Sequence, residues 1–161
     1  MRAWTIGFLL SLLALSGIVH GAEPTTEQLA DHIIRLSGRR PSVCSLPRMR
    51  DPQLAMALAE AGDAIVHGLV GEKEKLMEAR RVAAAEGRLG RSVYFSRFRR
   101  GAIPLADWYA DLLVVTDATD DRLGNLPVKE WGRVLSPYRG VAVVGRAADA
   151  EGELSPQALQ N

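Results

Sequence analysis

The chain has 161 residues with 20 basic and 19 acidic side chains, so its net charge of +1 excludes the basic excess typical of general nucleic-acid binders. It contains one cysteine, Cys44, which excludes an internal disulfide. Cys44 falls in a predicted buried strand, where a small core residue is expected rather than a nucleophile.

Residues 1–21 have the pattern of an export signal. Arg2 supplies a positive start, Ile6 to Val19 is apolar, and Gly21 and Ala22 are small residues suited to cleavage. The apolar run of about 14 residues is shorter than the roughly 20 that span a bilayer, although a retained anchor is the alternative. We predict cleavage after Gly21, with Ala22 as the other choice, and an exported chain that is periplasmic or extracellular. The mature chain of about 140 residues then has one domain's length.

Residues 22–41 are predicted to form a helix and a linker. Thr26 can cap a helix that runs to about Leu36, and the glycine of Ser37-Gly38 ends it. Pro41 keeps the residue before it extended, which suits a linker.

Residues 42–146 alternate between strand-like and helix-like segments, which predicts βαβ units and a parallel sheet. Right-handed crossovers make the expected fold an α/β, Rossmann-like, doubly wound and mainly parallel sheet of about five strands, with helices on both faces. The predicted strands are 43–46, 64–70, 92–98, 110–116 and 141–144, and the predicted helices are 52–62, 72–86 and 127–135. Residues 147–161 are interpreted as the start of a further helix or as a truncated tail.

Two stretches resemble a known family. Residues 103–115, IPLADWYADLLVV, resemble the segment that leads into the fourth strand of class I S-adenosylmethionine-dependent methyltransferases. Residues 133–144, RVLSPYRGVAVV, are similar to the helix, turn and fifth strand of that family. The resemblance implies the fold and leaves the activity open.

A closer likeness is to the degenerate methyltransferase-like domain that precedes a pyrroloquinoline-quinone-type (PQQ-like) β-propeller in exported bacterial proteins. The stretches that carry it, besides the signal, are Val66 to Leu69, Leu89 to Tyr94 and Glu151 to Pro156. The sequence has no propeller repeat, so the implied partner is a propeller in a missing or separate segment.

The resemblance places the cofactor turn directly after the first strand, at Leu46, Pro47 and Arg48. Active members have glycines there, because a side chain would collide with S-adenosylmethionine. Here the turn from Leu46 to Arg50 has no glycine, and Pro47 lacks a backbone N–H. We therefore expect cofactor binding to be lost or replaced.

Other expected cofactor positions also depart from the family pattern. Val70 stands where an acid for the ribose hydroxyls is expected, and Glu72 is the alternative, although a first-turn helix role explains it as well. After the third strand the chain has Arg97 to Arg100, including Arg99, where an acid would hold the adenine amino group. Asp117 follows the fourth strand, where substrate or catalytic residues are often found.

Several candidate sites have a plain structural interpretation. Asp117, Asp120 and Asp121 could bind a cation, but a loop with helix-capping aspartates is favoured. His32 and His67 lack a second ligand at metal spacing, so no metal site is predicted. Trp108 and Trp131 are expected to pack against the sheet or to line its edge.

Three functions remain open. The first is a noncatalytic module of an exported protein, with no cofactor, and the second is an active methyltransferase with an atypical turn that binds S-adenosylmethionine. The third is an anion or nucleotide binder that uses Arg48, Arg50 and the Arg97–Arg100 run, with the anion at the start of the helix that follows Asp51. The sequence does not identify a substrate or an oligomeric state.

Overall fold

A computed structural model describes residues 24–146, Gly152 and Ser155. The predicted export signal lies outside the described residues, and so does most of the predicted tail. Within the described part, no helix is long and apolar enough to cross a membrane.

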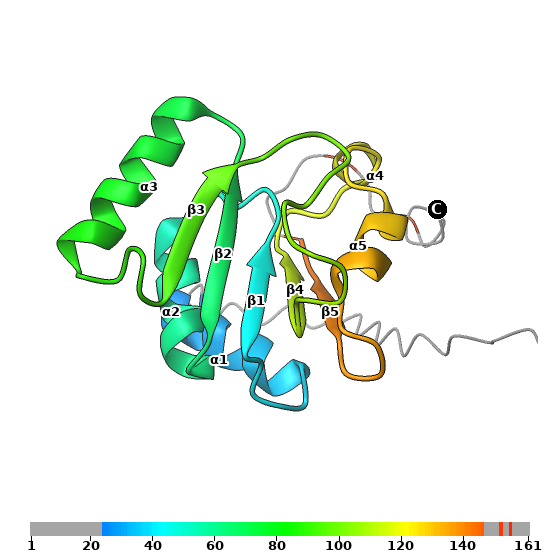
Figure 1. Cartoon of the computed structure of the whole chain (residues 1–161), viewed down its shortest axis with the longest axis horizontal. Helices are drawn as coiled ribbons and strands as arrows, with labels where there is room; N and C mark the ends of the chain where they lie inside the picture. The colour runs from blue at the N-terminus through cyan, green and yellow to red at the C-terminus, as the bar shows by residue number, and fades with distance from the viewer. Residues whose placement is uncertain (1–23, 147–151, 153–154, 156–161) are drawn as a thin grey trace, which may run out of the picture.

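The described strands form one five-stranded parallel sheet in the order β3-β2-β1-β4-β5 (Figure 1). Their bounds are β1 Val43–Leu46, β2 Ile65–Val70, β3 Val93–Arg97, β4 Leu112–Val115 and β5 Val141–Val144. From β1 the chain adds β2 and β3 on one side and then β4 and β5 on the other. The strand order therefore reverses between β1 and β4. The predicted doubly wound parallel sheet is therefore confirmed.

Three helices cover one face of the sheet: α1 Thr26–Leu36, α2 Pro52–Gly62 and α3 Lys73–Ala85 (Figure 1). Their ends follow from local chemistry. Asp51 caps α2 by accepting a hydrogen bond from the Gln53 N–H, and Pro52 fits the first turn because its missing donor is not needed there. The cap of α1 is Thr25 and not the predicted Thr26, because Thr25 and Gln28 form a reciprocal capping box.

The other face is covered differently. The short helices α4 Asp120–Leu123 and α5 Val128–Val134 pack on its β4 side, together with the loop that follows β3. Trp131 of α5 is buried there as predicted, whereas Trp108 is 64% exposed. The second face is therefore covered by α4 and α5 near β4 and by a loop near β3.

The two stretches that resemble methyltransferases are joined by Arg133. Its guanidinium donates to the carbonyl oxygens of Ile103 and Leu105, and to the carboxylates of Asp107 and Glu130 at 2.6 Å each. The Ile103 N–H in turn donates to Glu130. Arg133 and Glu130 thus fix the loop before β4 onto α5.

Candidate cofactor site at the carboxyl edge of the sheet

The reversal between β1 and β4 marks where a ligand is expected in this architecture. In open α/β sheets, ligands bind outside the carboxyl ends of the strands at the point where the strand order reverses. The segments that follow β1, β2, β3 and β4 all begin at this edge, which lies at the top of Figure 1. The predicted site residues belong to these four segments.

The turn after β1 is packed against the sheet. Leu46, Pro47 and Met49 are buried, and the Met49 N–H donates to the carbonyl oxygen of Leu69 on β2 at 2.8 Å. A Cβ added to Gly68 would lie only 2.7 Å from the sulfur of Met49, so Gly68 is what lets Met49 lie flat on β2. The space directly beside β2 is thus filled by the turn's own side chain.

Arg48 adopts the backbone conformation that glycine usually supplies. Its φ is 61°, in the left-handed region. Its guanidinium carbon lies 5.7 Å from the centroid of the Phe98 ring, within the range of a cation–π contact. The Arg48 side chain therefore reaches from the end of β1 to the residue that follows β3.

Glu72, the alternative ribose acid, is engaged elsewhere. It is the N-cap residue of α3, and its carboxylate accepts a hydrogen bond from Lys75 at 2.7 Å with a 64% exposed side chain. Val70, at the position expected for the acid, is 4% exposed and apolar. The end of β2 thus presents a buried valine and an exposed ion pair.

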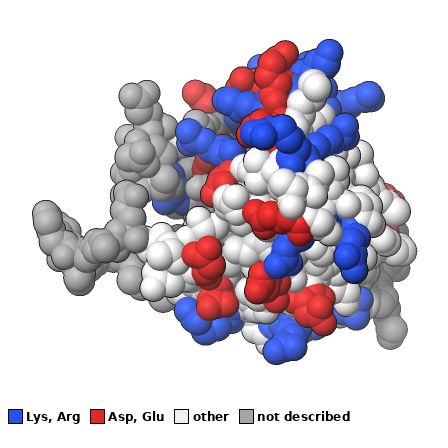
Figure 2. Space-filling model, turned by 90° about the vertical axis from the view of Figure 1, so that its left-hand side faces the viewer, with Lys and Arg blue, Asp and Glu red and all other residues white. Residues whose placement is uncertain are grey.

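The end of β3 and the tight turn that follows it carry three arginines. Gly101 has a φ of 75°, and the Ala102 N–H returns to the Arg99 carbonyl oxygen. Arg97, Arg99 and Arg100 are exposed, and none of them pairs with a carboxylate among the described residues. Figure 2 shows Lys and Arg gathered with acidic side chains over the upper part of the α3 side.

The segment after β4 is tied down by the chain that follows β5. Asp117 is 5% exposed, and the N–H of Ala118 donates to the Gly145 carbonyl oxygen. Asp120 accepts a hydrogen bond from the Ser155 N–H at 2.8 Å. Within the described residues, no group of three or more histidine, cysteine, aspartate or glutamate residues could hold a metal ion.

A polar row on the second face of the sheet has no counterpart in the predicted sites. Ser45, His67 and Ser96 lie on neighbouring strands, and His67 Nε2 is 3.0 Å from Ser96 Oγ. Within the described part, Ser45 Oγ and His67 Nδ1 are buried without a hydrogen-bond partner. Burial lowers the pKa of His67, which favours the neutral ring. The alternation of β2 was the available signal, because it places His67 and Leu69 on the same face.

Cys44 behaves as predicted. It is fully buried in β1, and burial raises the pKa of its thiol, which keeps it protonated. The start of α2, suggested as an anion site, is capped by the Asp51 carboxylate. An anion there would meet a negative charge.

Neither a known family profile nor a curated protein matches the sequence. Solved structures do match. One is a protein assigned as an S-adenosyl-L-methionine-dependent methyltransferase from Methanococcus maripaludis, with 24% identity, a TM-score of 0.62, and coverage of 74% of this chain and 54% of that one. The CcbJ methyltransferase from Streptomyces caelestis has 20% identity and a TM-score of 0.57, with 77% and 49% coverage.

A third match is the [4+2]-cyclase SpnF, with 18% identity, a TM-score of 0.59, and coverage of 73% of this chain and 43% of that one. It is named for a different reaction, so the likeness at these identities shows the fold alone. The chain spans about half the length of these three structures. The chain thus has the Rossmann-like fold of class I S-adenosylmethionine-dependent methyltransferases.

Proposed function

We propose that this chain is a noncatalytic methyltransferase-fold module of an exported protein. The observation that carries the proposal is the turn after β1: it has no glycine, Met49 packs on Gly68 in the core under the helix-covered face, and Arg48 extends to Phe98. Since a glycine-rich turn lets the cofactor approach the backbone in the family, a turn that carries side chains instead opposes S-adenosylmethionine binding. The missing acid at Val70 supports the same proposal.

The proposed context is the N-terminal part of a PQQ-like β-propeller protein. It rests on the export signal of residues 1–21 and on the sequence likeness described above, and S-adenosylmethionine is not normally supplied outside the cytoplasm. The reading frame beyond Asn161 is the direct test, because a propeller encoded there would support this context. N-terminal sequencing of the exported protein should begin at Ala22, or at Glu23 if cleavage follows Ala22.

The noncatalytic role is tested by calorimetric titration with S-adenosylmethionine and S-adenosylhomocysteine. We expect no saturable heat for either compound, whereas micromolar binding would overturn the proposal. The second candidate is an active methyltransferase with an atypical turn. It is favoured by one observation, the left-handed backbone that Arg48 retains, and micromolar binding in the same titration would support it.

A further inference from the structure

The loop after β3 and the end of the strand line a partly open pocket. Its volume is about 370 Å³, near the lower end of the range for small-molecule sites. Its lining residues are Ser96, Arg97, Arg99, Ala102 and Pro104. It thus combines polar side chains from the strand end and from Arg99 with the apolar Ala102 and Pro104 of the loop.

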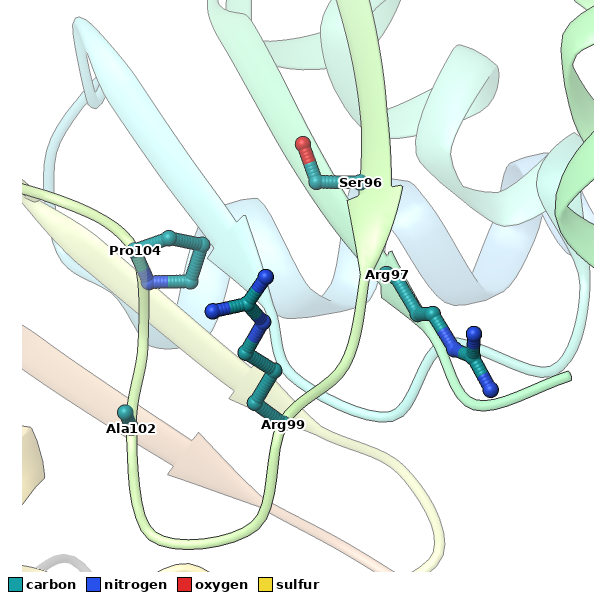
Figure 3. Close-up of a pocket in the computed structure, with 5 residues that line it drawn as sticks. All are labelled: Ser96, Arg97, Arg99, Ala102 and Pro104. Carbon is teal, nitrogen blue, oxygen red and sulfur yellow. The ribbon is translucent and has the colours of Figure 1, made fainter. Parts of the chain in front are cut away.

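The side chains around the pocket have different directions (Figure 3). Arg99 extends between the end of β3 and the loop, with its guanidinium toward Pro104, whereas the guanidinium of Arg97 points to the opposite side. Arg99 is therefore the cation that the pocket presents. Among the described residues no carboxylate neutralises it, so its donors are available to a ligand.

Ser96 can supply a second donor because of His67. Nδ1 of His67 is buried without a partner in the described part, while Nε2 contacts Ser96 Oγ. An unpaired buried N–H is rarer than an unpaired acceptor, so the favoured tautomer carries its proton on Nε2. His67 then donates to Ser96 Oγ, and the hydroxyl hydrogen of Ser96 is left to donate elsewhere.

We propose that this pocket binds a small organic oxyanion, a phosphate monoester or a carboxylate. The anionic group accepts hydrogen bonds from the Arg99 guanidinium and the Ser96 hydroxyl, because an arginine fork matches both kinds of oxyanion. The organic part lies against Ala102 and Pro104. This inference is independent of the noncatalytic role, because it requires neither the presence nor the absence of S-adenosylmethionine.

The test is a titration of the full chain with phenyl phosphate, benzoate and inorganic phosphate at constant ionic strength, followed by amide chemical shifts. We expect saturable shifts centred on Ser96 to Ala102, with phenyl phosphate or benzoate binding more tightly than inorganic phosphate because of the apolar wall. The tighter of the two organic probes identifies the anionic group. Absence of saturable binding by all three probes overturns the proposal.

Variants locate the site. Arg99→Gln should weaken binding by about tenfold or more and Ser96→Ala by about threefold, since each removes one donor to the anion. Arg100→Gln is the matched control, because it removes the same charge from the same turn but not from the pocket lining. Equal weakening by Arg99→Gln and Arg100→Gln would show diffuse attraction to the charged surface and would contradict the proposal.

Discussion

At the scale of single residues, Arg48 has one of the two properties that a glycine normally supplies. It has the left-handed backbone conformation, but it also carries a side chain. A left-handed φ costs a non-glycine residue about 1–2 kcal/mol, so the packing of Met49 and Phe98 must hold it in place. The sequence correctly indicated that the turn lacks glycine. It could not indicate that Arg48 has this conformation, because that depends on contacts with β2 and with Phe98, which are at least 20 residues away.

Gly68 is the residue on which this packing depends most. Gly68→Ala would place a Cβ 2.7 Å from the Met49 sulfur and 2.8 Å from the Phe95 ring, and should lower the free energy of unfolding by about 1–3 kcal/mol. Urea unfolding measures the change. Gly71→Ala is the control, since no heavy atom lies within 4 Å of its added Cβ. If both substitutions lower the free energy of unfolding by the same amount, Met49 does not lie on β2.

His67 should make stability depend on pH. Burial lowers its pKa in the folded chain below the ordinary value of 6.5, so the unfolded chain takes up the proton first as pH falls. Its contribution to stability is therefore complete above about pH 6.5 and is lost as pH falls through the lower, folded pKa. The free energy of unfolding should have the same slope against pH in the native chain and in His67→Gln above pH 6.5. Below pH 6.5 it should fall more steeply in the native chain.

His32→Gln is the control for that measurement, because His32 is exposed on α1. It should leave the pH profile of the native chain intact. A profile that changes equally with either substitution would contradict the role given to the buried ring.

At the scale of elements, the helices and strands followed from local patterns. The predicted strands 43–46 and 141–144 match β1 and β5, and Asp51-Pro52 starts α2 as expected. The strand predicted for 110–116 is shorter, Leu112–Val115, and the helical turn α4 was not predicted. Apolar runs do not mark where strand pairing stops, and a four-residue helix has no periodicity to detect.

Arg133 is the element-scale anchor that the sequence did not reveal. Its hydrogen bonds to the carbonyl oxygens of Ile103 and Leu105 join segments about 30 residues apart. Arg133→Gln should lower the free energy of unfolding by about 1–2 kcal/mol and speed amide exchange in the loop of residues 102–108. Arg81→Gln is the control: it breaks an exposed pair within α3 and should leave exchange in that loop unchanged.

Glu130 adds a pH dependence to the same anchor. The hydrogen bond from Arg133 lowers the pKa of Glu130 below its ordinary 4.5. The stability that this hydrogen bond contributes is present above about pH 4.5 and is lost as pH falls through the lower pKa of Glu130 in the folded chain. The protection factors of the amides in residues 102–108, followed from pH 6 down to about pH 3, should fall more in the native chain than in Glu130→Gln, whose anchor is weakened at every pH. A parallel fall of the protection factors in both chains would contradict this.

At the scale of the whole molecule, the two faces of the sheet are packed unequally. Three helices cover the first face, whereas a loop covers the β3 side of the second, where Tyr94 is 43% exposed. Native-state hydrogen exchange should therefore show local opening of residues 98–110 at low denaturant, before β1 and β2 exchange by global unfolding. Equal protection of both regions throughout would contradict this difference.

The fold was more predictable than the site for a physical reason. Parallel strands buried on both faces leave strong local patterns, and crossover handedness limits how they are arranged. The pocket beside Arg99 depends instead on the direction of two neighbouring arginines and on a hydrogen bond between strands. Such features arise only when residues distant in the chain are brought together.

The left-handed turn at Arg48 has a consequence for the recognition of distant relatives. The turn after β1 lacks the glycines of the family's cofactor turn, while Arg48 has the positive φ that glycine usually supplies. The chain shares its overall fold with structures that are only 20% and 24% identical, so the backbone is similar where the sequence is not. The dihedral angles directly after the first strand are thus a more direct basis than the glycine motif for comparing chains of this fold.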